Sequence, residues 1–139
     1  MIDYEKVFAD SYKRVLGGST SQENAFFDDF YERFIAASPT VAQKFQHVDM
    51  TFQKQMLKQS LILLANLFAT KRIPDGLREI ARKHSSGAAD IPPELYQLWL
   101  ECLLATVKKA DPRYGDDVEL AWRMISSQGI AFMTFMYRR

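Results

Sequence analysis

Glycine and proline divide this sequence into segments of helical length, and this feature constrains the fold most. Gly17-Gly18, Ser38-Pro39, Ile73-Pro74 and Pro92-Pro93 separate stretches that are each long enough to form a helix. No stretch alternates apolar and polar residues in the period-two pattern of a half-buried strand. We therefore predict an all-α chain.

Seven helices are expected, and several carry recognisable start signals. Thr20-Ser21-Gln22-Glu23 is predicted to open the second helix with a reciprocal capping box, and Ser38-Pro39 to open a short third helix. Asp49 or Thr51 is expected to cap a long fourth helix after a short loop. The expected ranges are about 4–16, 20–37, 39–45, 49–70, a shorter segment opened by 73–76 and reaching 84, 94–109 and 117–137.

Two of these helices carry clear apolar stripes at helical spacing. On the long fourth helix the stripe consists of Leu57, Leu61, Leu64 and Phe68, and on the last helix of Trp122, Ile125, Gly129, Phe132 and Met136. We expect the long fourth helix to be central to the core and the stripe of the last helix to point inward.

Length and composition limit the number of domains and the classes of partner. The chain has 139 residues, of which 47% are hydrophobic, so residues 1–139 are expected to form one domain with a real core. Its 18 basic and 17 acidic residues give a net charge of +1, which disfavours a nucleic-acid partner. A monomer and a homodimer both remain open.

Cysteine usage and the lack of long apolar runs indicate where such a chain works. Cys102 is the only cysteine, which excludes an internal disulfide and a cysteine-based metal cluster and fits a reducing cytoplasm. The first residues lack the pattern of a secretory signal, and no apolar run reaches the length of a membrane span. We expect a cytoplasmic protein without a membrane partner.

The small number of histidines limits the metal sites that this chain can build. His84 shares an apolar helical face with Leu77, Ile80 and Ala81, whereas His47 lies in a loop. Two histidines cannot build a multi-histidine site, but haem iron needs only one imidazole from an apolar wall. A core histidine with satisfied ring nitrogens is the alternative. The ten Phe, six Tyr, two Trp and six Met would serve either a packed core or a pocket for a flat ligand.

Several ordered motifs resemble one known family. The motifs are Phe30-Tyr31-Glu32-Arg33-Phe34, Ser38-Pro39, Phe45, His84, Ile91-Pro92-Pro93-Glu94-Leu95-Tyr96, Cys102-Leu103-Leu104 and Ala121-Trp122. In their order and spacing they resemble bacterial single-domain globins and the globin domain of flavohaemoglobins, over nearly the whole chain.

The resemblance implies a globin fold of about seven helices around a haem b pocket. His84 would be the proximal iron ligand, Phe45 would pack against the haem, and Tyr31 would reach a bound gas from the distal side. For Ile80, Ile91 and Tyr96, core packing and haem contact are the same prediction, because the haem would be part of the core.

The distal side has a register that the sequence leaves open. Gln53 fits best as a second donor, with Leu57 one turn later, but a shift by one residue would place Phe52 and Met56 there instead. Lys54 and His47 are candidate sixth ligands, although solvated surface roles are the ordinary alternative for both.

Charged residues flank the expected iron ligand. Arg78, Arg82 and Lys83 could pair with the haem propionates, and a solvated helix face is the alternative reading of all three.

Two departures from flavohaemoglobins bear on function. Tyr96 matches their proximal tyrosine, but no Asp or Glu follows Trp122 to supply the accompanying glutamate, and we expect no reductase domain beside the single globin domain of residues 1–139. We therefore expect reversible binding of O2, and of NO or CO, as a carrier, scavenger or sensor, and leave open whether the chain is an enzyme. The alternatives are an NO dioxygenase or peroxidase-like enzyme that uses an external reductase, and a non-haem interaction domain.

Overall fold

The computed structural model describes all 139 residues as seven α-helices without a strand. The helices are α1 (Tyr4–Leu16), α2 (Thr20–Ala37), α3 (Pro39–Lys44), α4 (Met50–Thr70), α5 (Asp75–His84), α6 (Glu94–Ala110) and α7 (Asp116–Met136). Their bounds differ from the sequence estimates by at most about one residue, the usual uncertainty of helix ends. The all-α class and the number of helices are thereby confirmed. No helix combines the length and the apolar character needed to cross a membrane.

Two of the expected helix starts are confirmed and one is wrong. Ser38 caps α3 ahead of Pro39, and the Asp49 carboxylate accepts from the first backbone amides of α4. The capping box at residues 20–23 does not form, because Ser19 has the extended backbone of a cap residue and accepts from the Gln22 amide at 3.1 Å. Glu23 instead forms an ion pair with Lys58 of α4.

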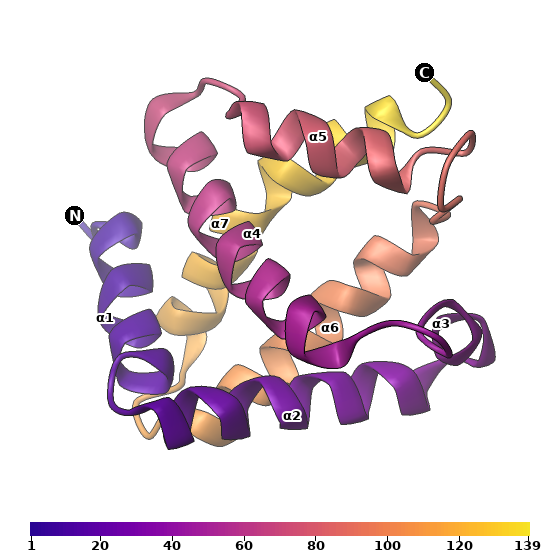
Figure 1. The fold of residues 1–139 in the computed structure, drawn as a ribbon. Coiled ribbons are helices and arrows are strands. Elements are labelled where there is room, and N and C mark those ends of the chain that lie inside the picture. The colour runs from indigo at the N-terminus through magenta and orange to yellow at the C-terminus, as the bar shows by residue number, and fades with distance from the viewer.

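Helices α4 and α7 cross at the centre of the molecule (Figure 1). Helix α1 packs against α7, α2 packs against α6, and α5 lies along the C-terminal half of α7. Leu57, Leu61 and Leu64 of α4 are buried as expected, whereas Phe68 is only half-buried.

The C-terminal half of α7 buries a different residue from those expected. Phe132 and Met136 are half-buried, and Met133 is 8% exposed. An α-helix has 3.6 residues per turn, so the inward stripe drifts from Trp122 and Gly129 to Met133 along this long helix.

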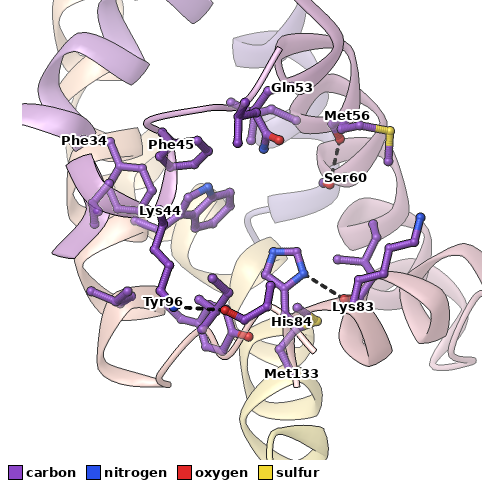
Figure 2. Close-up of a pocket in the computed structure, with 18 of the residues that line it drawn as sticks. Phe34, Lys44, Phe45, Gln53, Met56, Ser60, Lys83, His84, Tyr96 and Met133 are labelled. Carbon is purple, nitrogen blue, oxygen red and sulfur yellow. Dashed lines mark hydrogen bonds between the residues drawn. The ribbon is translucent and has the colours of Figure 1, made fainter. Parts of the chain in front are cut away.

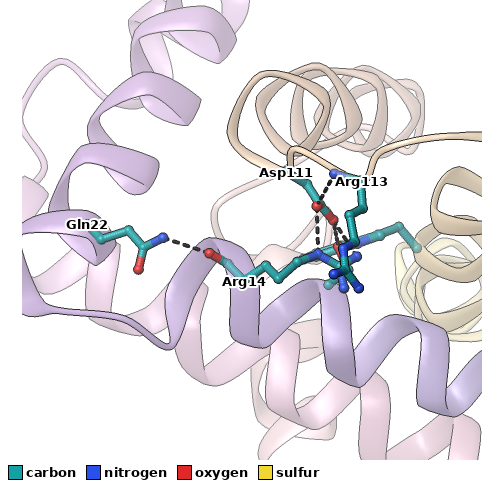
Figure 3. Close-up of polar contacts among 6 residues, drawn as sticks. Arg14, Gln22, Asp111 and Arg113 are labelled. Atoms are coloured by element: carbon teal, nitrogen blue, oxygen red, sulfur yellow. Dashed lines mark hydrogen bonds and ion pairs between the residues drawn. The ribbon is translucent and has the colours of Figure 1, made fainter.

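A buried carboxylate links α1 to the segment that follows α6 (Figure 3). The Asp111 side chain, which follows α6, has no exposed surface and accepts from Arg14 Nε and Nη2 at 2.7 and 2.9 Å. It also accepts from Ser11 Oγ at 2.6 Å, and Ser11 Oγ in turn accepts from the Trp122 indole at 2.9 Å. The network ties α1 to α7 and to the end of α6.

Candidate ligand pocket

A cavity of about 340 Å³ lies between α2, α3, α4, α5, α6 and α7, and it is in the size range of small-molecule sites. It is lined by 24 residues, 18 of them hydrophobic, so it suits a largely apolar ligand. The nine residues that the sequence favoured as iron ligand or haem contacts all line this cavity: Tyr31, Phe45, Phe52, Gln53, Leu57, Ile80, His84, Ile91 and Tyr96.

His84 is the last residue of α5, and its ring stands in the cavity (Figure 2). Its Nδ1 lies 2.8 Å from the Ile80 carbonyl oxygen. A carbonyl can only accept, so Nδ1 carries the proton and Nε2 keeps a free lone pair. Burial lowers the pKa of His84, which favours the neutral ring. The side chain therefore has the tautomer and charge state that a metal ligand requires.

Across the cavity from His84, α2 and α4 contribute a polar pair. Gln53 Nε2 donates to the Tyr31 hydroxyl at 3.2 Å, and this hydroxyl lies 3.3 Å from the Gln53 backbone carbonyl, to which it donates. Burial raises the pKa of Tyr31 to about 12, so the hydroxyl keeps its proton at neutral pH. The pair places a hydroxyl and a side-chain amide, hydrogen-bonded to each other, on a largely apolar wall.

The first turns of α4 place both distal alternatives at the cavity, but at different depths. Gln53 is half-buried and Leu57 is 4% exposed. Phe52 is 57% exposed and lies at the rim, and Met56 is half-buried. The Gln53 and Leu57 register is thus the more deeply buried of the two.

Aromatic rings form much of the remaining wall. The Phe45 ring lies 5.5 Å from that of Tyr31 and 6.0 Å from that of Phe34, measured between centroids. Sequence reasoning missed Phe34, Trp99 and Met133 as lining residues. Phe34 and Trp99 follow Tyr31 and Tyr96 by three positions, so helical spacing alone could have identified both.

Tyr96 leaves a buried polar atom without a partner. Its hydroxyl forms no hydrogen bond within the protein, and its ring centroid lies 6.5 Å from that of His84. Burial raises the pKa of Tyr96 to about 12, so this group is a neutral hydroxyl. No carboxylate bonds to it.

Four charged or titratable residues considered from the sequence do not line the cavity. Lys54 forms an ion pair with Asp28 of α2, and His47 is exposed in the turn after α3. Arg78 and Arg82 likewise lie outside the lining, whereas Lys83 is part of it.

One solved structure matches the chain over its full length. A protein from Pseudomonas aeruginosa PAO1, described as structurally highly homologous to a human haemoglobin, is 34% identical with a TM-score of 0.89. The match covers 99% of the present chain and 100% of the Pseudomonas chain. No protein-family model and no curated protein matches the sequence. Together with the seven helices, this likeness confirms the fold expected from the sequence.

Proposed function

Because this chain belongs to the family of the haemoglobin-like Pseudomonas protein, we propose that it is a haem-binding globin that reversibly binds O2, and NO or CO as well. It would act as a carrier, scavenger or sensor. The observation that carries this proposal is His84, whose free Nε2 faces an apolar cavity with a polar pair on the opposite wall.

The residues of the cavity fit a b-type haem. His84 would hold the iron through Nε2, and Phe45, Leu57, Ile80 and Ile91 would pack against the ring. The bound haem would supply the iron on which a diatomic gas binds. The protein would supply the imidazole of His84, the apolar enclosure and the polar pair.

Tyr31 and Gln53 would set the preference among gases. Their donors act in a buried environment, where a hydrogen bond to a ligand that accumulates negative charge is stronger than in water. Such donors stabilise bound O2 more than CO, because O2 draws more electron density from the metal. The Tyr31–Gln53 pair thus supports an O2-binding role.

The surroundings of Tyr96 support binding rather than enzymatic turnover. The Tyr96 hydroxyl has no hydrogen-bond partner, and His84 Nδ1 donates to a backbone carbonyl rather than to a carboxylate. A carboxylate partner would make the imidazole a stronger electron donor. We therefore rank NO dioxygenation with an external reductase below reversible binding.

The visible spectrum of the purified protein tests the proposal. The wild type reconstituted with haem should show an intense Soret band, which His84→Ala should abolish or grossly alter. His47→Ala is the matched control, because His47 is exposed and lies off the cavity, and it should leave the band unchanged. An unchanged spectrum and haem content in His84→Ala would remove His84 from its role, and the absence of any band in the wild type would refute the proposal.

A further inference from the structure

The outer face of α7 carries no charge over most of its length. Leu120 and Phe135 are 43% and 56% exposed, and Ser127 and Ala131 between them are exposed as well. These positions follow one another at intervals of seven, four and four residues, so they form one stripe along the helix. The stripe thus has a large apolar side chain toward each end and small side chains in the middle.

The only charged side chain between the two ends of this stripe is already neutralised. Arg123 forms ion pairs with Glu101 of α6 and Glu119 of α7, at 2.9 and 3.0 Å. Leu120 and Phe135, in contrast, are left largely in solvent, where burial of their apolar surface by a partner would be favourable.

The two ends of α7 carry opposite charges. Asp116 and Asp117 begin the helix and form no capping hydrogen bond, and Arg138 and Arg139 follow its last turn. Both arginines stack on neighbouring aromatic rings and neither pairs with a carboxylate. Each pair of charges has the sign that the helix dipole favours at its end, so it also stabilises the single chain. All four side chains are exposed and remain available to a partner.

An antiparallel pair of α7 helices would cover the stripe. When two copies are aligned about a twofold axis between Ser127 and Gln128, Leu120 of each copy lies opposite Phe135 of the other, because both are equally far from the axis. The small side chains of Ser127 and Ala131 then lie near the crossing point, where they allow the two helices to approach closely.

The same alignment pairs the charged ends. Asp117 comes to lie opposite Arg138 of the other copy, and Asp116 opposite Arg139, and the twofold axis repeats both contacts at the other end. A parallel pair would instead place like charges together at each end, which is unfavourable. The charge pattern therefore selects the antiparallel orientation.

We propose that this chain forms a symmetric homodimer through the outer face of α7, with the two helices antiparallel. A single pair of helices is a small interface, so the dimer dissociates on dilution. The residues of α7 that line the cavity are Gly129, Ile130 and Met133, and none of them belongs to the stripe. The dimer therefore does not depend on haem or on the proposed function.

Sedimentation velocity over a range of protein concentrations tests the dimer. The wild type should shift from one chain to two as the concentration rises, and added salt should oppose this shift. Asp116→Lys with Asp117→Lys should raise the dissociation constant about tenfold or more, because attractive contacts at both ends become repulsive. Adding Arg138→Glu and Arg139→Glu to that chain should restore the dimer with reversed signs. Glu32→Lys, a charge reversal at an exposed site on α2, is the control and should have no effect.

Cross-linking tests the orientation of the two helices. Ser127→Cys should form a disulfide between two copies under mild oxidation, because residue 127 lies beside the axis in both. Leu120→Cys should not, since its two copies would lie about 22 Å apart along the helices. The wild type, whose single Cys102 is buried, should not cross-link either.

Each result decides between the dimer and its alternatives. A wild type that sediments as one chain at every concentration refutes the dimer and leaves the proposed function untouched. A dimer that the charge reversals do not weaken, or that cross-links as readily through Leu120→Cys as through Ser127→Cys, refutes the antiparallel α7 interface. Far-UV circular dichroism of each variant verifies that a lost dimer is not a lost fold.

Discussion

The Tyr31 hydroxyl has a single proton, and two groups of Gln53 contact it. It accepts from the Gln53 amide and donates to the Gln53 carbonyl, so a ligand must compete with that carbonyl for its proton. Tyr31→Phe removes this donor. We expect O2 to dissociate about tenfold faster or more, and CO to change by less than about threefold, because one buried hydrogen bond is at stake. Stopped-flow displacement of each gas measures both rates.

A second tyrosine and a second distal variant sharpen that measurement. Tyr12→Phe is the control, since Tyr12 lies on α1 away from the cavity, and it should leave both rates unchanged. Gln53→Leu should also accelerate O2 loss, through removal of the amide donor. Equal changes in the O2 and CO rates of Tyr31→Phe would remove Tyr31 from the proposed role.

The sequence predicted the placement of a side chain well where helical periodicity determines which face of the helix carries it. His84 was identified from its apolar face, and it lies in the cavity. Lys44, which also lines the cavity, was not identified, because the position of a lysine after a short helix depends on the loop that carries Ala89, which no local pattern predicts. The Gln53 register stayed open for the same reason, since the loop before α4 sets it.

At the scale of elements, Gly129 allows α4 and α7 to approach closely. A Cβ added at Gly129 would lie 1.9 Å from Leu64 Cδ2, and both residues line the cavity. Gly129→Val should lower the free energy of unfolding by about 1–3 kcal/mol, as overpacking does, and should weaken haem uptake because the displaced Leu64 enters the cavity. Urea unfolding and haem titration measure the two effects.

Two further variants isolate the contact between Gly129 and Leu64. Gly87→Val is the control, because no atom lies within 4 Å of a Cβ at Gly87. The combination of Gly129→Val with Leu64→Ala should cost less than the sum of the two single changes. If the free-energy costs of the two single changes simply added in the double variant, contact with Leu64 would not be the reason that residue 129 must be small.

The Asp111 network gives α1 a pH-dependent attachment. Burial alone would raise the pKa of Asp111, but the hydrogen bonds from Arg14 and Ser11 outweigh it and hold this pKa below its usual value. The carboxylate therefore stabilises the fold above its unfolded pKa, and this contribution is lost as pH falls through the folded pKa. Asp111→Asn should cost about 1–3 kcal/mol at pH 7 and progressively less below about pH 4.

Urea unfolding across this pH range, with Asp10→Asn as the control, tests the attachment. Asp10 pairs with Lys6 at an exposed site, so its replacement should change stability by less than about 0.5 kcal/mol. A penalty for Asp111→Asn that is the same at pH 3 and pH 7 would contradict this account.

The sequence located the elements but not the contacts that join them. Glycine and proline set the helix bounds, because their backbone preferences act locally. No local pattern could assign Asp111 its partners, because Ser11 and Arg14 lie 100 and 97 positions earlier. The sequence did not identify Ser19 as the cap of α2, because Thr20 and Ser21, which follow it, also carry hydroxyl groups that can cap a helix.

For the whole molecule, the cavity and the stability of the fold should be linked through the ligand. Six of the seven helices or their flanking loops contribute to the cavity wall, so an unfolded chain cannot reproduce it. A ligand that binds only the folded chain stabilises it by mass action, by about 2.7 kcal/mol at a free concentration of 100 times Kd. For a domain of this size that corresponds to a rise in Tm of roughly 10 °C.

Differential scanning of the apoprotein with increasing haem measures this rise. It should grow with the logarithm of the haem concentration in the wild type, shrink in His84→Ala and stay intact in His47→Ala. The Asp111→Asn variant starts from a lower Tm but should show the same increment, because its network lies away from the cavity. If Asp111→Asn lost the haem-dependent rise in Tm and His84→Ala kept it, haem would bind outside the pocket. The expected result, a rise that is reduced in His84→Ala and unchanged in Asp111→Asn, would link the stabilisation to haem bound in the pocket beside His84.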